Sequence, residues 1–169
     1  MDSLSTHGGS LRVFVSHVEN KNPIDKTVND ILNLELKFGL NNLKTYEKFK
    51  NDVFNLKHQA LNFLFKEKKK NKKIIAYGAA AKGNTFLNYC GIGNEFIDFV
   101  VDRSKFKQGK YLPGNNIPIV SEEKLINHKP DYIIILPWNL TEEIIQQLSY
   151  AKKWGCLFVT FIPKLKISK

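Results

Sequence analysis

The sequence has few of the residues that mark metal-binding, disulfide-bonded or membrane proteins. Its 169 residues include 2 cysteines, Cys90 and Cys156, without CxxC spacing, and 4 scattered histidines. No metal site is therefore expected, and both cysteines are expected to be reduced and buried. The longest apolar run, Ile133–Trp138, falls far short of the ~18–20 residues that span a bilayer. Because Met1–Leu4 has neither a basic nor an apolar leader region, we expect a cytoplasmic protein with no membrane association.

Arginine is nearly absent, although the chain is strongly basic. Lys and Arg total 26 against 16 Asp and Glu, a net charge of +10, yet only Arg12 and Arg103 are arginines. Nucleic-acid binders rely on arginine for bidentate contacts, so a nucleic-acid partner is not favoured. We interpret the lysine run 66–73 as a solvated helix end, with a nucleic-acid patch as the alternative. The excess positive charge does favour anionic ligands.

The first part of the chain predicts one strand and two helices. Residues 11–17 alternate apolar and polar side chains, as in a half-buried strand. No hairpin partner is evident nearby, so this strand is expected to pair with something distant or outside the chain. Helical spacing predicts a helix over 24–38, with Pro23 in its first turn and Gly39 after its end. A second amphipathic helix is predicted over 43–70, and its apolar stripe needs a surface of this protein or of a second copy.

From residue 73 onward, short apolar strands alternate with helices. The run 132–136 is continuously apolar, as in a parallel strand that is buried on both faces. This alternation predicts an α/β fold with a Rossmann-like, doubly wound parallel sheet, preceded by the two-helix bridge and the orphan N-terminal strand. Strands are predicted over 73–77, 96–101, 117–119, 132–136 and 157–162, and helices over 85–90, from Ser121 onward, and over 141–154.

The turn after the first of these strands is the first candidate site. Ligands of open parallel sheets bind beyond the carboxyl ends of the strands. The small residues of Gly78–Thr85 let the backbone approach a ligand, and the following helix offers N–H groups to a phosphate. The turn lacks a GxGxxG pattern, and Asn84 stands where a Walker A motif has lysine, so NAD binding and ATP hydrolysis are not favoured. A structural turn is the alternative, although Lys82 favours an anion.

Two further stretches are predicted at the same edge of the sheet. Asp102 ends a strand, where dinucleotide folds carry an acid for ribose hydroxyls, although a turn or ion-pair role is equally open. The cations of the loop 103–114 could bind the two phosphates of a diphosphate, and the alternative is a loop that is only solvated. Trp138 suits base stacking, and Asn139 suits a ligand or a helix cap. The candidate substrate-binding residues are Gly78, Ala79, Ala80, Lys82, Gly83, Asn84, Asp102, Arg103, Lys107, Lys110, Tyr111, Pro113, Gly114, Trp138 and Asn139.

No catalytic residue is predicted. The sequence has no GxSxG or HExxH motif and no Cys–His pair of known spacing. The acidic pairs Glu122-Glu123 and Glu142-Glu143 are typical of first helical turns. His7, beside Gly8-Gly9, is the only histidine in a suggestive setting.

Several motifs nevertheless resemble one family, and the resemblance covers nearly the whole chain. The strings THGGSLR (6–12), YGAAAKGNT (77–85), VDRS (101–104), KQGKYLPG (107–114), IPI (117–119) and LPWN (136–139) stand in the order found in one group of enzymes. The sequence resembles the C-terminal part of the S-adenosylmethionine-dependent sugar C-methyltransferases, which act on nucleotide-linked deoxysugars.

The resemblance implies a three-part layout: a cysteine-rich zinc module, a central S-adenosylmethionine-binding fold and a C-terminal Rossmann-like domain that helps to hold the nucleotide sugar. Residues 1–20 would then be the tail of the cofactor domain, 21–72 a helical bridge and 73–169 the Rossmann-like domain.

The implied function is recognition of a nucleotide diphosphate sugar, with dTDP as the expected nucleotide, in deoxysugar biosynthesis. The chain alone would bind no cofactor and transfer no methyl group, since S-adenosylmethionine belongs to the complete enzyme. A separate S-adenosylmethionine-binding domain or a second copy would be its protein partner. The alternatives are a stand-alone nucleotide-binding module that regulates or scaffolds an enzyme, and a fragment of an NAD-dependent oxidoreductase.

Overall fold

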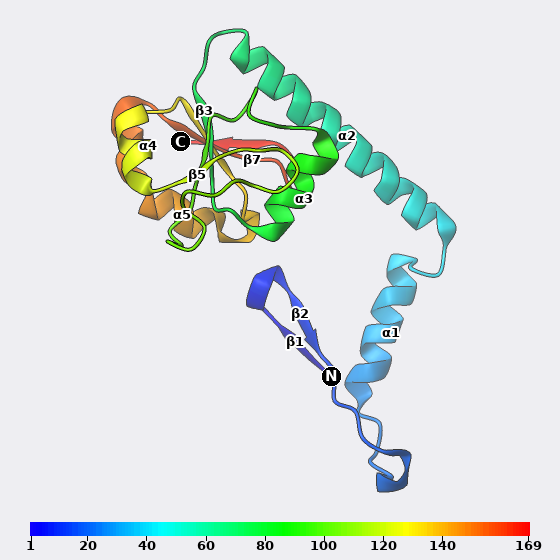
Figure 1. Ribbon diagram of the computed structural model, residues 1–169. Coiled ribbons are helices and arrows are strands. Elements are labelled where there is room, and N and C mark those ends of the chain that lie inside the picture. The colour runs from blue at the N-terminus through cyan, green and yellow to red at the C-terminus, as the bar shows by residue number, and fades with distance from the viewer. The chain divides into compact units, whose positions relative to one another are not determined.

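Two units, 1–53 and 54–169, make up the computed structural model, which describes residues 1–169 except for the side chain of His7 (Figure 1). The suggestive histidine therefore lies outside the described side chains. The first unit holds β1 (Asp2–Leu4), η1 (Thr6–Gly8), β2 (Ser10–Arg12), η2 (Val18–Asn20), α1 (Lys26–Phe38) and the start of α2 (Leu43–Lys68).

The orphan strand predicted over 11–17 was wrong in its extent and in its lack of a partner. It ends at Arg12, and β2 pairs antiparallel with β1, with Ser3 opposite Leu11. Gly8 and Gly9, with φ of 86° and 120°, allow the chain to reverse between the two strands. The sequence hid this hairpin because three residues of β1 are too short to show an alternating pattern.

The two helices predicted before residue 73 are confirmed, with small shifts at their ends. α1 begins at Lys26 rather than residue 24, because Asp25 is its N-cap and accepts from the Thr27 N–H (2.8 Å). Gly39, with φ 86°, ends α1 as predicted. α2 ends at Lys68, two residues earlier than expected.

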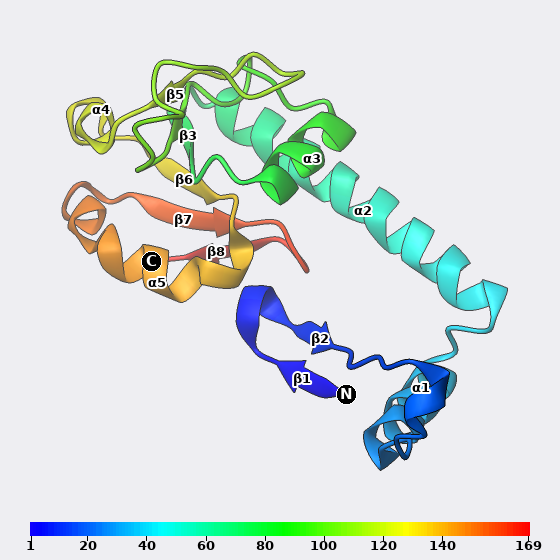
Figure 2. The ribbon, with the colours of Figure 1, turned by 60° about the horizontal axis from the view of Figure 1, so that its bottom comes forward.

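A six-stranded, mostly parallel sheet forms the second unit, which confirms the predicted fold class (Figure 2). Its order is β5-β4-β3-β6-β7-β8, all parallel except β8, which pairs antiparallel with β7. The strands are β3 (Ile74–Tyr77), β4 (Val100–Val101), β5 (Ile119–Val120), β6 (Tyr132–Ile135), β7 (Leu157–Thr160) and β8 (Lys166–Ser168). The sequence did not predict β8, and the strand predicted over 96–101 shortens to its last two residues.

The helices of this unit differ from the predictions at their starts and breaks. α3 (Ala81–Cys90) begins four residues before the expected Thr85, so the second half of the predicted turn is helical. α4 (Glu122–His128) follows Ser121, whose side chain makes no capping hydrogen bond. The helix predicted over 141–154 is divided at Leu148 into α5 (Thr141–Gln147) and η4 (Ser149–Trp154), and it ends at Gly155. A short 3-10 turn, η3 (Trp138–Leu140), precedes it.

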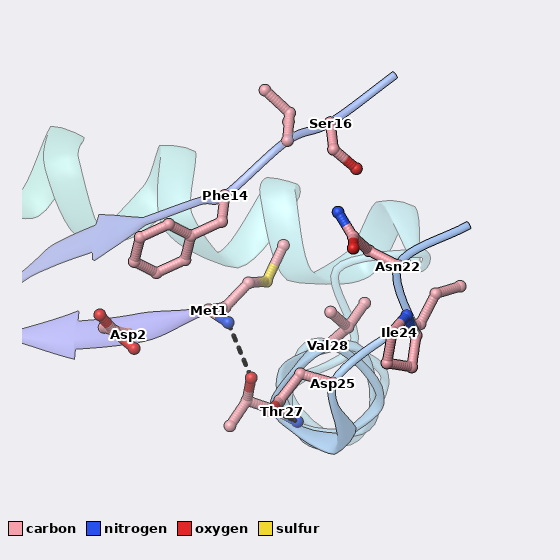
Figure 3. A pocket seen from close by; sticks show the side chains of 11 residues that line it. Met1, Asp2, Phe14, Ser16, Asn22, Ile24, Asp25, Thr27 and Val28 are labelled. Atoms are coloured by element: carbon pink, nitrogen blue, oxygen red, sulfur yellow. Dashed lines mark hydrogen bonds between the residues drawn. The ribbon is translucent and has the colours of Figure 1, made fainter. Parts of the chain in front are cut away.

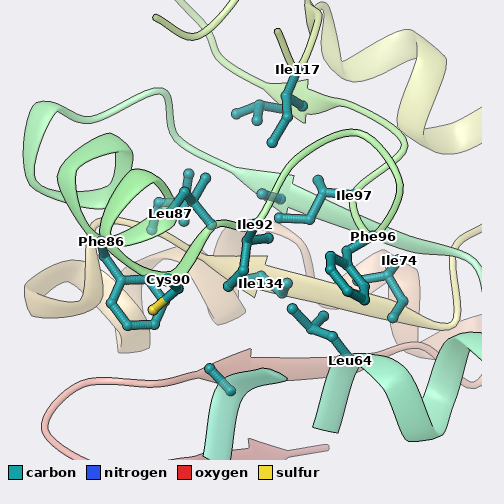
Figure 4. Packing of buried hydrophobic residues seen from close by; sticks show 14 of the residues in the cluster. Leu64, Ile74, Phe86, Leu87, Cys90, Ile92, Phe96, Ile97, Ile117 and Ile134 are labelled. Atoms are coloured by element: carbon teal, nitrogen blue, oxygen red, sulfur yellow. The ribbon is translucent and has the colours of Figure 1, made fainter. Parts of the chain in front are cut away.

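Side chains alternate between two buried faces of the sheet. On one face Ile134 of β6 packs in a cluster with Leu64 of α2 and Leu87 of α3 (Figure 4). On the other face Ile133 and Ile135 pack with residues of α4, α5 and η4. Burial on both faces confirms the prediction for 132–136, and the C-terminal part of the α2 stripe packs on this unit.

Both cysteines are buried free thiols, as expected. Burial raises the pKa of Cys90 to about 11 and that of Cys156 to about 12. None of the described helices combines the length and the apolar character needed to cross a bilayer.

Candidate functional site

The crossing from β3 to α3 depends on two glycines. Gly78 has φ 83°, and a Cβ on it would lie 2.6 Å from Cδ of Pro137. A Cβ on Gly83, in the first turn of α3, would lie 2.5 Å from Cβ of Leu136. These two predicted site residues therefore let α3 pack closely against the end of β6, which fixes where the helix begins.

The N-terminus of α3 has no side-chain cap. Ala80 is the N-cap residue, no acid stands in the first turn, and the first backbone bond runs from the Asn84 N–H to the Ala80 carbonyl (3.0 Å). Among the described residues, no hydrogen-bond partner is found for the N–H groups of residues 81–83. Such N–H groups, together with the helix dipole, favour an anion at this position.

Asp102 and Lys107 fasten this turn to the loop beside it. The Asp102 carboxylate accepts from the N–H groups of Ala79 (2.7 Å) and Ser104 (2.8 Å). Lys107 Nζ donates to the Ala79 carbonyl (2.9 Å) and lies 3.3 Å from Asp102 Oδ2. Of the roles left open for Asp102, the structure favours the turn and ion-pair role, and Lys107 shares it.

A pocket of about 570 Å³ opens beside the α3 N-terminus. It includes seven predicted residues: Ala79, Ala80, Asn84, Lys107, Lys110, Tyr111 and Pro113. Ala81, Thr85, Phe106, Leu112 and Ile119 complete its lining and were not predicted. The side chains of Phe106 and Tyr111 are 87% and 63% exposed, so two aromatic rings face solvent at this pocket. The sequence signal that could have identified Phe106 as a pocket residue is its position as an aromatic residue within a lysine-rich loop.

The other predicted residues lie outside this pocket. Lys82 Nζ donates to Asn139 Oδ1 and lies 4.8 Å from the Trp138 ring centroid. Trp138 and Asn139 line a separate cavity at the start of α5. Arg103 Nε lies 4.0 Å from Glu122 Oε2. Gly114 lies against Asn88, since a Cβ on it would fall 2.1 Å from Asn88 Oδ1. Lys107 and Lys110 are thus the predicted cations that line the pocket.

Other parts of the molecule suit an anion less well. A cavity of about 580 Å³ in the first unit is lined by Asp2 and Asp25, and the Met1 amino group there donates to Thr27 Oγ1 (2.8 Å) (Figure 3). Its carboxylates disfavour phosphate. Within the described part of the chain, no cluster of three or more His, Cys, Asp or Glu side chains could hold a metal ion.

Comparisons with known proteins point to one kind of enzyme. Residues 5–163 match the family model described as the C-methyltransferase C-terminal domain. The chain is 33% identical over 161 residues to the C-methyltransferase NovU of Streptomyces niveus. That match covers 95% of this chain and 38% of NovU, so the chain spans well under half the length of this curated relative.

Proposed function

The chain belongs to the family of C-methyltransferase C-terminal domains, and we propose that it recognises the diphosphate of a nucleotide-linked sugar for such an enzyme. One observation carries the proposal. The pocket at the carboxyl edge of the sheet combines the uncapped N-terminus of α3, two lysines and two exposed aromatic rings. A helix N-terminus and lysines suit the phosphate oxygens of a nucleoside diphosphate, and an exposed aromatic ring suits its base.

Each part of the pocket has a chemical counterpart in that ligand. Phosphate oxygens would accept hydrogen bonds from the N–H groups of residues 81–83, at the positive end of the helix dipole. Lys110 is exposed and would supply a counter-charge, while Lys107 would hold the turn in place. Phe106 or Tyr111 would stack on the base. The family resemblance makes dTDP the expected nucleotide.

The pocket does not suit the methyl donor. S-adenosylmethionine carries a positively charged sulfonium, whereas Lys107 and Lys110 line the pocket and none of its described lining residues is a carboxylate. We therefore assign no described residue to the donor. The family resemblance gives that role, and the catalytic bases, to a separate cofactor fold.

Titration calorimetry with dTDP, UDP, NAD and S-adenosylmethionine tests the proposal. We expect dTDP to bind most tightly, and Lys110→Ala to weaken it about ten- to a hundred-fold, because one charge-assisted contact is lost. Lys105→Ala is the matched control, since Lys105 is an exposed lysine of the same loop outside the pocket lining. Absence of dTDP binding, or equal effects of the two variants, would refute the site.

Lys82 provides a second comparison at the same helix. Its ammonium group contacts Asn139 and Trp138 instead of lining the pocket. We therefore expect Lys82→Ala to weaken dTDP binding less than Lys110→Ala does. A larger effect of Lys82→Ala would move the proposed phosphate position toward Trp138.

Methyl transfer is proposed to need more than residues 1–169. The purified chain should transfer no label from S-adenosylmethionine to a dTDP-linked sugar. Label on the sugar would overturn this part of the proposal. Transfer that appears only after a cofactor domain is added would support it.

A further inference from the structure

Helix α2 carries two stripes of largely apolar side chains, and the sheet covers only one of them. The first stripe includes Ala60 and Leu64, which are fully buried, and Leu64 points into the core cluster (Figure 4). The second, which we call the outer stripe, consists of Phe54, His58, Leu61 and Phe65. At about 100° per residue these four positions fall within about 60° of one another, on a different side of the helix from the first stripe.

The two phenylalanines of the outer stripe are exposed but already held in place. Phe54 is 56% and Phe65 is 61% exposed. The Phe54 ring packs edge-on against His58 (centroids 4.4 Å apart), and the Phe65 ring packs edge-on against Phe96 (4.8 Å). Because these contacts restrict both rings, a partner that covers them orders little that is not ordered already. Exposed apolar surface of this kind marks a site of protein association.

The spacing of the outer stripe is symmetrical, which identifies the partner. Phe54 and Phe65 are equally distant in sequence from the midpoint between residues 59 and 60, and so are His58 and Leu61. In an antiparallel pair of α2 helices, Phe54 therefore meets Phe65 of a second copy at each end, and His58 meets Leu61 between them. Steps of four, three and four residues are also those of a coiled-coil seam. A two-fold dimer requires a surface that is complementary to itself, and a partner of different sequence does not.

The charges along α2 favour the antiparallel direction. Asn55 and Asn62 flank the outer stripe on one side and are uncharged. On the other side Lys57 is turned back onto its own chain, since its Nζ donates to the Tyr89 carbonyl (3.0 Å) and lies 5.3 Å from the Tyr89 ring centroid. The lysine run 66–73 follows the stripe. A parallel pair would bring the two runs together, whereas an antiparallel pair places them at opposite ends of the paired segment.

We propose that two copies of this chain associate through the outer stripe, with their α2 helices antiparallel. The stripe covers about three helical turns, so the contact is small and the dimer is weak and depends on protein concentration. None of the four stripe residues lines the phosphate pocket. The inference is therefore independent of the proposed function, and the absence of nucleotide binding would leave it unaffected.

Sedimentation velocity of residues 1–169, over about 10 µM to about 1 mM, tests the association. We expect the sedimentation coefficient of the wild type to rise with concentration toward that of a dimer. Phe54→Glu should weaken association about ten-fold or more, because a carboxylate would be buried in the seam. Phe49→Glu is the matched control. Phe49 is a 68% exposed phenylalanine of the same helix, about 140° or more around it from Phe54 and His58, and this variant should associate as the wild type does.

A mixture of two variants tests the direction of pairing. Phe54→Glu and Phe65→Lys should each associate poorly alone. In an antiparallel pair of one copy of each, the new glutamate meets the new lysine at one end, and the two remaining phenylalanines meet at the other. Mixing the variants should therefore restore association, whereas a parallel pair would leave each charge opposite a phenylalanine.

Three results would overturn the proposal. They are a wild type that stays monomeric up to about 1 mM, equal weakening by Phe54→Glu and Phe49→Glu, and a mixture of the charged variants that stays monomeric. The first would leave the outer stripe to a different protein. Thermal unfolding followed by circular dichroism checks that each variant folds, and Phe54→Ser, which introduces no charge, replaces Phe54→Glu if that variant does not.

Discussion

The two units of the molecule use their apolar residues very differently. Every buried hydrophobic side chain lies between Ala60 and Phe161, in the second unit, whereas none of the described side chains of 1–53 is buried. The first unit is not poor in such residues, because Leu32, Leu34, Leu36 and Phe38 of α1 are all more than half exposed. A supply of apolar residues is therefore not enough to form a core.

Spacing does not explain this difference, because both helices have an apolar side. The buried residues of α2, Ala60, Phe63 and Leu64, form one stripe against the sheet. On α1 the apolar residues also gather on one side, which includes Val28, Ile31 and Leu32. None of them is buried, so what α1 lacks within its own unit is a second layer that covers this side.

Hydrogen exchange gives the largest contrast between the units. Amides of β6, in the middle of the sheet, should exchange only on global unfolding, which costs about 5 kcal/mol or more in a domain of this size. Amides of β2, in a three-residue hairpin strand, should exchange through local opening at little cost. The measurement is exchange of the free protein by NMR in dilute solution, and equal protection of both strands would break the comparison.

Truncation of one side chain in each unit sharpens the same contrast. Ile134→Ala should lower the free energy of unfolding by about 2–5 kcal/mol, because Ile134 is 1% exposed at the centre of the sheet. Leu34→Ala, on α1, should change it by less than about 0.5 kcal/mol. Denaturant unfolding followed by circular dichroism measures both, and a comparable loss from Leu34→Ala would show that α1 packs in solution.

The fold of the second unit could be predicted well from sequence because its alternation of short apolar strands with helices is a local pattern that repeats along the chain. The apolar run 132–136 and Gly155 marked β6 and the end of the following helical segment correctly. The edge strands β1 and β8 were missed, since three residues carry too little periodicity to be recognised. Their pairing depends on where the chain returns in space, which no local pattern specifies.

The candidate site was predicted in part for a similar reason. Residue type and position along the chain selected Ala79, Ala80 and Lys110, which the structure places in the lining of one pocket. The direction in which the Lys82 side chain points was not predicted. Because α3 begins at Ala81, the rotation of the helix carries this side chain to Trp138.

Adding one methyl group tests how tightly the second unit is packed. Gly→Ala in an exposed helix would gain about 1 kcal/mol. At Gly83 the new Cβ would lie 2.5 Å from Cβ of Leu136, and such overpacking costs about 1–3 kcal/mol. We therefore expect Gly83→Ala to lower the free energy of unfolding by about 1 kcal/mol net. Asn33→Ala, at an exposed position of α1, is the control and should leave the free energy of unfolding unchanged or slightly raised. A higher free energy of unfolding for Gly83→Ala would show that α3 can shift on the sheet.

The smallest expected effect concerns pH and Glu67, a buried carboxylate of α2. It accepts hydrogen bonds from Lys70 Nζ (2.8 Å) and Tyr132 Oη (3.1 Å). The bond from Lys70 holds the pKa of Glu67 below its ordinary 4.5. A lowered folded pKa means that the stabilisation is present above that ordinary value and is lost as pH falls through the folded pKa.

Glu67→Gln should therefore cost about 1 kcal/mol at pH 7 and flatten the decline of stability between about pH 5 and 3. Glu35→Gln, the same charge change on an exposed residue of α1, should keep the wild-type profile, and a profile of Glu67→Gln as steep as wild type would show that other carboxylates of the sheet unit govern its acid unfolding.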